Sequence, residues 1–469
     1  MLDIADRMLA MRQYVDDDVT VAIETLLMSA PDARLNRINP LAFAAAHGLD
    51  ERESIAAFLH GTQLGLFELS WNVVCSSCGG VLHSAGSLRS ISQEPYRCAL
   101  CARDCEPNLE EAVEVTFTVD PRLRRIAAHD PDSLPLWDYV RQIFWSSGSD
   151  LPDDVREAVR TAVADAVEIP PAGQALRRLH LESGLAILFD PVTHSSRFLE
   201  MEGPPASSLQ TLAVRIDEAR APGPTLRISP GQLDLSLENG TAHRVLPILW
   251  IAGEALKTLV QHRIPVLTAK RLLTHQTFRD LYRTNVLDIN QRFRITSLTF
   301  LFTDLKGSTA LYEEIGDLAA YDLIRFHFQL ALEAVSRHDG AVVKTIGDAI
   351  MATFPTAAQG VAAALDIRKA ITELNRHDSR QDLALKIGLH SGPCLAVLMN
   401  ERQDYFGQTV NIAARVQGSA TPDLILVTSP VMEDAGVRAL LDRADTPVRS
   451  FQTLLRGIHE EMLVFGIEA

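Results

Sequence analysis

Two aspartates follow apolar, strand-like segments in the last third of the chain. The first stretch, TFLFTDLKGST (299–309), leads from apolar residues into Asp304. The second, VVKTIGDAIMATF (342–354), predicts a hairpin with Asp348 at its tip, because a glycine precedes this aspartate between two β-rich runs. Each aspartate alone would suit an ordinary turn or cap. Together, at the ends of two apolar strands, they indicate oxygen ligands for Mg²⁺ or Mn²⁺.

The turn after Asp304 has the composition of a phosphate-binding loop. Ser308 and Thr309 are suited to cap a helix that continues through ALYEEIG, and backbone N–H groups at a helix start bind phosphate. Lys306 and Gly307 stand in the turn itself, where glycine allows close approach of a ligand. A carboxylate beside this loop would repel phosphate, so the pattern favours a metal that bridges the two.

Four segments resemble, in order and spacing, the catalytic domain of class III adenylate/guanylate cyclases: FLFTDLKGSTALYEEIGD, GAVVKTIGDAIMATF, LKIGLHSGP and DYFGQTVNIAARV. The resemblance covers about residues 295–469. It implies a ferredoxin-like α+β domain that works as a homodimer with active sites shared between the chains. It also implies a signalling enzyme that converts a nucleoside triphosphate into its 3′,5′-cyclic monophosphate and pyrophosphate, with two Mg²⁺ or Mn²⁺ ions per site.

The resemblance assigns roles to individual residues. Asp304 and Asp348 match the metal-binding aspartates, and the carbonyl group of Leu305 would complete that site. Asn411 and Arg415 match a ribose-orienting asparagine and a transition-state arginine, and a helix would place them on one face.

Substrate-binding roles follow in the same way. Lys306, Gly307, Ser308 and Thr309 form the phosphate-binding turn, and Arg456 lies near the position of a phosphate-binding lysine.

Lys344 and Asp404 match the pair that recognises the purine base. An ammonium group donates to N1 of adenine and a carboxylate accepts from its 6-amino group, whereas guanine reverses both polarities. We therefore expect an adenylate cyclase that makes cyclic AMP from ATP. The alternatives are a guanylate cyclase, or a catalytically silent cyclase fold that serves binding or dimerisation. The chemically suitable residue at each functional position favours the enzyme.

Four of the six cysteines form two Cys-x-x-Cys pairs, CSSC with Cys75 and Cys78 and CALC with Cys98 and Cys101. This spacing predicts a tetrahedral structural zinc in a zinc ribbon. Disulfides or plain buried thiols are the alternative, and Cys105 is a further possible ligand.

The remaining patterns predict a multidomain α+β protein. The expected parts are a helical, helix-turn-helix-like region (1–70), the zinc ribbon (71–106), a β-rich sandwich-like module with a helical insertion (107–265), a helix and linker (266–294), and the cyclase domain (295–469). Within the β-rich module, alternating strands on either side of Asn239-Gly240 predict a hairpin.

Composition limits the partners. The 469 residues carry a formal net charge of −16, which disfavours nucleic acid as a partner. The helix-turn-helix-like segment suggests DNA binding, but its second helix opens with the acidic run DERES. The N-terminal part resembles the winged-helix and zinc-ribbon region of some bacterial cyclases. No apolar run reaches the length of a membrane span, so we expect a cytoplasmic protein without an integral membrane segment.

Overall fold

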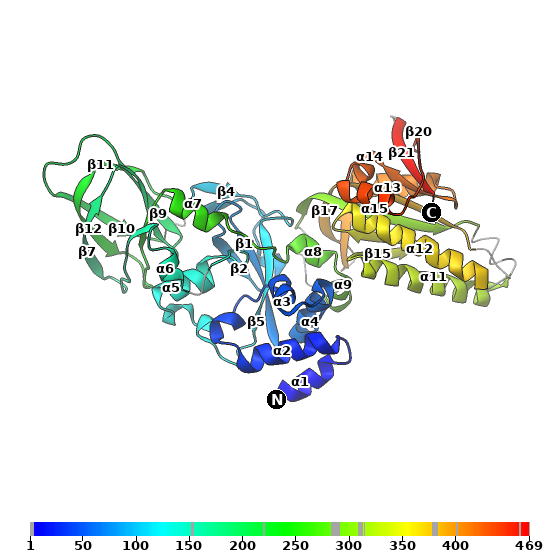
Figure 1. The fold of residues 1–469 in the computed structure, drawn as a ribbon, viewed down its shortest axis with the longest axis horizontal. Helices are drawn as coiled ribbons and strands as arrows, with labels where there is room; N and C mark the ends of the chain where they lie inside the picture. The colour runs from blue at the N-terminus through cyan, green and yellow to red at the C-terminus, as the bar shows by residue number, and fades with distance from the viewer. Residues whose placement is uncertain are drawn as a thin grey trace. The chain divides into compact units, whose positions relative to one another are not determined.

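The computed structural model describes residues 4–151, 154–218, 221–282, 291–307, 313, 315–377, 383–399, 402–458 and 461–468. The fold is mixed α+β, and the chain forms two compact units (Figure 1). The first comprises Met1–Pro107 with Glu111–Thr268, and the second comprises Asn108–Glu110 with Ala269–Ala469. Within the described ranges, no helix has both the length and the apolar character needed to cross a membrane.

The first unit begins with four helices and a three-stranded sheet. The helices are α1 (Ile4–Met11), α2 (Asp17–Ser29), α3 (Pro40–His47) and α4 (Glu51–Gln63). The strands are β1 (Phe67–Val74), β2 (Val81–Ala85) and β5 (Val113–Val119), in the order β2-β1-β5. Asn39 and Asp50 cap the starts of α3 and α4 with their side chains, and Gly48 ends α3 in the left-handed conformation at φ 65°.

Strand β5 corrects one sequence prediction. The segment AVEVTFTV (112–119) falls in the predicted β-rich module (107–265), but β5 pairs with β1, which precedes that module, along its whole length, from Phe67↔Val119 to Val73↔Val113. Every residue of β5 is buried, and the ring of Phe117 stacks on that of Phe58 in α4 at 5.1 Å. Its alternating sequence, VEVTFTV, indicates a strand but does not identify which strand it pairs with.

Two sheets enclose one core in the rest of this unit. One sheet has the order β10-β12-β7, formed by β10 (Gln210–Ile216), β12 (Gly231–Asn239) and β7 (Gln174–Leu181). The other has the order β11-β9-β8-β13-β6, formed by β11 (Leu226–Ile228), β9 (Ser195–Met201), β8 (Gly184–Asp190), β13 (Ile248–Ile251) and β6 (Val163–Ala166). Alternate leucines of β12 pack against Leu188, Leu199 and Leu249 of the second sheet.

The predicted helical insertion is short. It contains α5 (Leu136–Tyr139), a π-helical turn at Val140–Phe144, and α6 (Val155–Ala158). A further helix, α7 (Glu254–Gln261), follows β13.

The hairpin predicted at Asn239-Gly240 is wrong, because β12 and β13 belong to different sheets. Asn239 is buried and organises the crossing instead. Its side-chain amide donates to the carbonyl groups of Ile169, Pro170 and His243 at 3.1, 2.9 and 2.7 Å, and its oxygen accepts from Thr241. The Asn-Gly pattern predicts a turn correctly, but the turn connects two layers and not two neighbouring strands.

The second unit is built on a mixed sheet with the order β15-β16-β14-β17-β19-β21-β20, and β18 pairs with β17. Its strands are β14 (Phe293–Leu305), β15 (Ala341–Ile346), β16 (Ala349–Phe354), β17 (Leu385–Met399), β18 (Arg402–Phe406), β19 (Leu424–Thr428), β20 (Val448–Leu454) and β21 (Glu461–Glu468). Taken in chain order, the first four strands are arranged 4-1-3-2 and antiparallel, with one helix after the first and another after the third. This is the ferredoxin-like arrangement.

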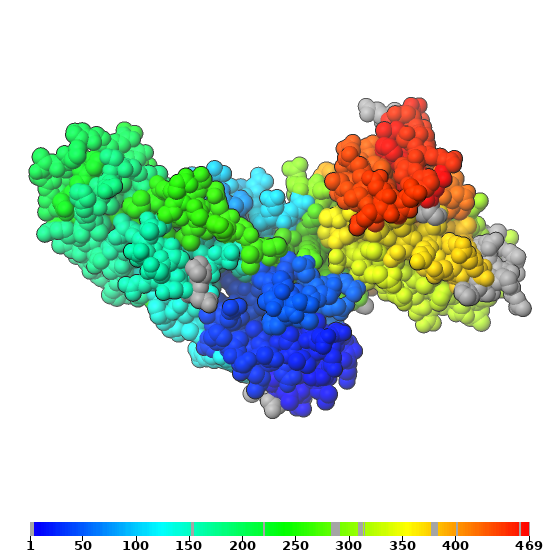
Figure 2. Space-filling view, viewed as in Figure 1, coloured from blue at the N-terminus to red at the C-terminus, as the bar shows by residue number. Residues whose placement is uncertain are grey.

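Helices cover both faces of this sheet. Helices α11 (Asp317–Arg337), α12 (Ala357–His377), α14 (Ser429–Met432) and α15 (Ala435–Arg443) share one core with Ile425 and Val427 of β19. Helix α13 (Gln408–Ser419) packs with the intervening Leu426, which points to the other face. The long helices α11 and α12 lie side by side in Figure 1 and form one continuous surface in Figure 2.

The helix predicted after residue 266 consists of two short helices, α8 (Ala269–Leu273) and α9 (Gln276–Leu281). Both pack in the second unit. Most of the predicted linker, residues 283–290, lies outside the described residues.

We predict that Asn239→Ala destabilises the first unit by about 1–3 kcal/mol, because buried backbone groups lose their hydrogen-bond partner. Gln232→Ala, at the exposed start of the same strand, is the matched control. All four tryptophans lie in the first unit, so urea unfolding followed by tryptophan fluorescence reports on it selectively. Equal midpoints for the two variants would contradict the assigned role of Asn239.

Candidate active site and cysteine cluster

The two aspartates lie at the same end of neighbouring strands. Asp304 is the penultimate residue of β14, and Asp348 follows Gly347 in the turn between β15 and β16. Gly347 has φ 65°, a conformation in which glycine avoids the strain of a side chain. Because β16 pairs with β14 in antiparallel register, Thr303 lies opposite Ile350 and the turn reaches Asp304.

The electrostatics of the pair suit a cation. Burial raises the pKa of the Asp304 carboxyl, and the negative charge of Asp348 raises it further. Oδ2 of Asp348 is buried and has no hydrogen-bond partner within the described part of the chain. Two close carboxylates that repel each other, one with an unsatisfied oxygen, fit Mg²⁺ or Mn²⁺.

The segment after Asp304 is only partly described. Leu305 ends β14 with its side chain buried, and Lys306 and Gly307 form an exposed turn in which Gly307 has φ 76°. The backbone N–H of Lys306 donates to the carbonyl of Ala384 at 2.8 Å. Ser308 and Thr309 lie outside the described residues.

Lys344 and Asp404, 60 residues apart in sequence, form an ion pair. Nζ of Lys344, on β15, donates to Oδ2 of Asp404, on β18, at 2.5 Å. Oδ1 of Asp404 accepts from the backbone N–H of Tyr405 at 2.8 Å. The lysine side chain is 41% exposed and that of the aspartate only 11%, so the lysine is the more accessible member of the pair.

The remaining predicted residues are exposed. Asn411 and Arg415 lie one helical turn apart on α13, and their side chains face outward. Arg456 lies in the turn after β20, and no hydrogen bond or ion pair joins it to the other site residues in the described ranges. The single chain therefore brings together the two aspartates and, separately, Lys344 with Asp404.

The structure also points to a residue that the sequence analysis missed. His327, on the inner side of α11, is fully buried, and neither ring nitrogen has a hydrogen-bond partner among the described residues. Burial lowers its pKa to about 4, and the negative charge of Asp348 opposes this shift. Its regular inward position on the helix reads as an ordinary core position in the sequence.

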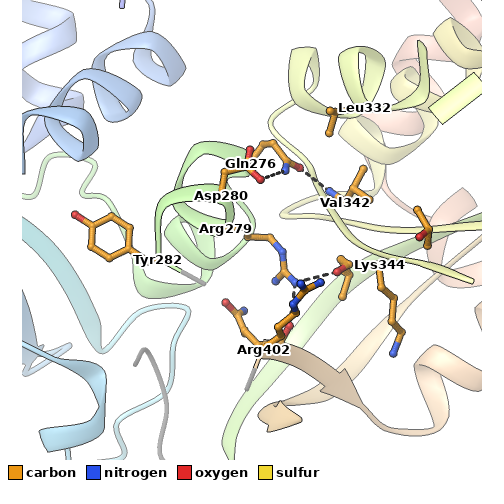
Figure 3. Close-up of a pocket in the computed structure, with 11 residues that line it drawn as sticks. Gln276, Arg279, Asp280, Tyr282, Leu332, Val342, Lys344 and Arg402 are labelled. Carbon is orange, nitrogen blue, oxygen red and sulfur yellow. Dashed lines mark hydrogen bonds between the residues drawn. The ribbon is translucent and has the colours of Figure 1, made fainter. Parts of the chain in front are cut away.

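A cavity of about 290 Å³ lies next to Lys344 (Figure 3). Strands β15 and β18, helix α11 and the short helix α9 contribute to its lining. Arg279 and Gln276 of α9 are two further residues that sequence reasoning did not single out, since they precede all of the cyclase motifs.

The four cysteines of the two Cys-x-x-Cys pairs form a compact cluster. Their sulfur atoms all lie within 4.8 Å of one another, with Sγ–Sγ distances of 3.4 Å for Cys75–Cys101 and 3.6 Å for Cys78–Cys98. These distances are longer than a disulfide bond, and all four residues are free thiols. The first pair follows β1 and the second belongs to the hairpin of β3 (Tyr96–Cys98) and β4 (Arg103–Cys105).

The chemistry of this cluster fits a metal. Hydrogen bonds from Cys101 and the neighbouring thiols lower the pKa of Cys75. Burial isolates the cluster from water at three of its four positions. Four sulfur donors with this spacing suit a tetrahedral zinc ion that has no open coordination position. Cys105 is buried beside the cluster but is not one of the four.

Two family models match the chain. Residues 291–449 match the adenylate and guanylate cyclase catalytic domain, and residues 1–280 match a family of unknown function, DUF5939.

Known relatives match the cyclase part. Adenylate cyclase 2 of Rhizobium meliloti (strain 1021) is 31% identical over 165 residues, 33% of this chain and 44% of that protein. Human retinal guanylyl cyclase 1 is 31% identical over 172 residues, 34% of this chain and 15% of that protein. The match therefore spans less than half the length of either relative.

Solved structures match the same part. The adenylyl cyclase CyaB from P. aeruginosa is 21% identical, with a TM-score of 0.34, over 38% of this chain and 96% of that one. The guanylyl cyclase Cya2 is 23% identical, with a TM-score of 0.33, over 37% of this chain and 92% of that one.

The C-terminal part is thus a class III adenylate/guanylate cyclase catalytic domain, a class that uses Mg²⁺ or Mn²⁺. The chain as a whole belongs to the DUF5939 family, whose model covers more than half of it. The family match gives the N-terminal region no winged-helix or zinc-ribbon assignment.

We predict that the purified protein contains about one zinc ion per chain and that Cys75→Ser loses it. Cys394→Ser is the control, because Cys394 is a buried thiol of β17 in the other unit. Metal content is measured by mass spectrometry after gel filtration. Stoichiometric zinc in a variant that lacks all four cluster cysteines would show that the ligands are elsewhere.

Proposed function

We propose that this protein is an adenylate cyclase, which converts ATP into 3′,5′-cyclic AMP and pyrophosphate. The observation that carries the proposal is the contact between Lys344 and Asp404 at 2.5 Å. It places a cationic donor beside an anionic acceptor at the rim of a cavity.

This donor and acceptor complement adenine. The Lys344 ammonium donates to N1, and the Asp404 carboxylate accepts from the 6-amino group. Guanine would present a donor to the ammonium and an acceptor to the carboxylate, so both contacts would be repulsive. Before ligand binds, the ion pair satisfies both charged groups. When adenine binds, both the ammonium and the carboxylate must therefore keep a hydrogen-bond partner.

The other residues act on the ribose and the phosphates. Asp304 and Asp348, with the carbonyl of Leu305, would hold two Mg²⁺ or Mn²⁺ ions, which supply acidification of the ribose 3′-hydroxyl and charge neutralisation of the triphosphate when bound. Asn411 would orient the ribose, and Arg415 would stabilise the charge that develops on the α-phosphoryl group.

The loop that follows β14 and one arginine near the C-terminus would contact the phosphates. These residues are Lys306, Gly307, Ser308, Thr309 and Arg456.

We further propose that the active enzyme is a homodimer with two shared sites. The outward-facing Asn411 and Arg415 of α13 are exposed in the single chain. Exposed apolar side chains also lie close to site residues in sequence: Ile346, Met399 and Phe406 are 53%, 47% and 62% exposed. Apolar groups in such positions are typical of a protein interface.

Two other functions are tested by the same experiments. A guanylate cyclase would require a different base-recognition pair, although several relatives, human retinal guanylyl cyclase 1 among them, carry that name. A silent cyclase fold would bind nucleotide without releasing pyrophosphate. Incubation of the purified protein with ATP or GTP and Mg²⁺ or Mn²⁺, with product analysis by chromatography, separates the three outcomes.

We predict that Lys344→Glu combined with Asp404→Cys lowers kcat/KM for ATP and shifts preference toward GTP. Each mismatched hydrogen bond in a buried polar site costs about 1–3 kcal/mol. Lys369→Glu, at an exposed lysine on α12, makes the same charge change as Lys344→Glu but away from the site, and it should leave the preference unaltered. An unchanged ATP-to-GTP ratio in the double variant rules out this pair as the base selector.

We predict that Asp304→Ala and Arg415→Ala homodimers are each nearly inactive and that mixing them restores activity. In the mixed dimer one site carries both lesions and the other carries neither, so about half the wild-type activity per heterodimer is expected. Cyclic AMP formation is measured across mixing ratios after subunit exchange.

The control for this mixture is a chain that carries both substitutions, mixed with Asp304→Ala. Neither site of that heterodimer has intact metal ligands, so it should stay inactive. Confirmed Asp304→Ala/Arg415→Ala heterodimers that are as inactive as their parents would mean that each chain builds its site alone.

A further inference from the structure

By sequence, helix α8 and nearly all of helix α9 fall within the DUF5939 match. By packing, both helices belong to the second unit, which contains the cyclase sheet. The DUF5939 match extends to residue 280, whereas the compact unit that contains the cyclase sheet begins its main segment at Ala269. The twelve residues 269–280 therefore belong both to the DUF5939 match and to the second unit. Their contacts show what they do in the catalytic unit.

This segment is attached to the two strands that carry the base-recognition pair. Oε1 of Gln276 accepts from the backbone N–H of Val342, on β15, at 2.8 Å. The carbonyl of Leu273 accepts from the hydroxyl of Tyr405, on β18, at 3.3 Å. Phe278, two residues after Gln276, is buried and stacks on Tyr282 at 4.9 Å.

Arg279 connects both strands with one guanidinium group. Its Nη2 donates to the carbonyl of Gln403 at 2.9 Å and to the carbonyl of Val343 at 3.3 Å. Figure 3 shows the side chain extending from α9 toward both acceptors. The two acceptors are the residues that immediately precede Asp404 and Lys344.

The position of these carbonyls matters because a peptide unit is planar. The carbonyl of Val343 and the Cα atom of Lys344 lie in one plane, and the same holds for Gln403 and Asp404. A donor that holds both carbonyls therefore restrains the two Cα atoms from which the recognition side chains extend.

Among the described strands, no ladder of backbone hydrogen bonds joins β15 directly to β18. β15 is an edge strand, and β18 pairs with β17, so β16, β14 and β17 stand between the two in the sheet order. The Lys344 side chain is long and has several rotatable bonds, so its contact with Asp404 tolerates a range of strand separations. The Arg279 bridge restricts β15 and β18 to a narrower range of separations.

We propose that Arg279 is a positioning residue for base recognition: it holds Lys344 and Asp404 at the separation that fits adenine. This rests on the proposed role of that pair in adenylate cyclase activity. It also makes the last helix of the DUF5939 match part of the substrate site.

The test uses the full-length chain with Arg279→Ala, Arg279→Gln and Arg279→Lys. Arg402→Ala is the matched control, because Arg402 lines the same cavity and its loss changes the charge equally. For each protein, kcat and KM are measured with ATP and GTP. Equilibrium binding of ATP and GTP in the presence of Ca²⁺ is measured by calorimetry, and thermal unfolding is recorded in parallel.

We expect Arg279→Ala to raise KM for ATP about tenfold, equivalent to one charge-assisted hydrogen bond, and to reduce the ATP-to-GTP preference by a similar factor. Arg279→Lys keeps a cation that can donate to both carbonyls and should restore most of the preference. Arg279→Gln should be intermediate, and Arg402→Ala should match the wild type.

Two results would overturn the proposal. The first is an unchanged KM and base preference in a folded Arg279→Ala protein, which would leave the residue only a structural role. If Arg279→Ala does not fold, an unchanged preference in folded Arg279→Gln has the same meaning.

The second is an equal loss in Arg402→Ala, which would assign the effect to charge in the cavity. A wild-type protein that binds ATP but forms no cyclic nucleotide would refute the proposed activity, and the binding preferences would then decide the role of Arg279. A wild-type protein that does not bind ATP would refute both.

Discussion

The second unit depends on hydrogen bonding along both edges of β14. On one side of β14, Thr299–Thr303 pair with β16. On its other side, β14 pairs with β17 as far as Leu305. A strand held in this way cannot slide by one residue without exposing its apolar face. Asp304 is therefore held firmly at its end, and the turn before β16 presents Asp348 beside it. β17 continues past the other end of β14 and turns back as β18, which carries Asp404.

The result is an electrostatic division within one domain. Burial and the like charge of Asp348 both raise the pKa of Asp304, so this half of the site is arranged for a cation. Lys344 and Asp404 neutralise each other, so the other half is arranged for a neutral ligand with a donor and an acceptor. A nucleoside triphosphate has both features, with a highly charged phosphate chain and an uncharged base. The separation of the two halves thus matches the separation of chemistry within the proposed substrate.

Family boundaries and packing boundaries differ in this chain. Residues 108–110 lie far before the cyclase match, which begins at residue 291, yet they pack in the catalytic unit. Glu110 accepts from the backbone N–H groups of Thr296 and Ser297, both at 3.1 Å, and pairs with Lys270 at 3.0 Å. These contacts lie at the irregularity in the pairing of β14 with β17, where backbone donors would otherwise lack partners. A fragment cut at the family boundary would lose this support for the central strand.

The sequence by itself determined the features that depend on neighbouring residues. Glycine at 347 allows the turn that presents Asp348, and the spacing of Asn411 and Arg415 gives one helix face, because both are consequences of local backbone geometry. The cyclase motifs likewise identified the catalytic domain. Only the tertiary structure decided which strand β5 joins, that Asn239 connects two layers, and that Arg279 bridges two strands. Each of these features depends on contacts between residues far apart in the chain. The local sequence does not identify such partners, because many strands and many carbonyl groups could serve equally well.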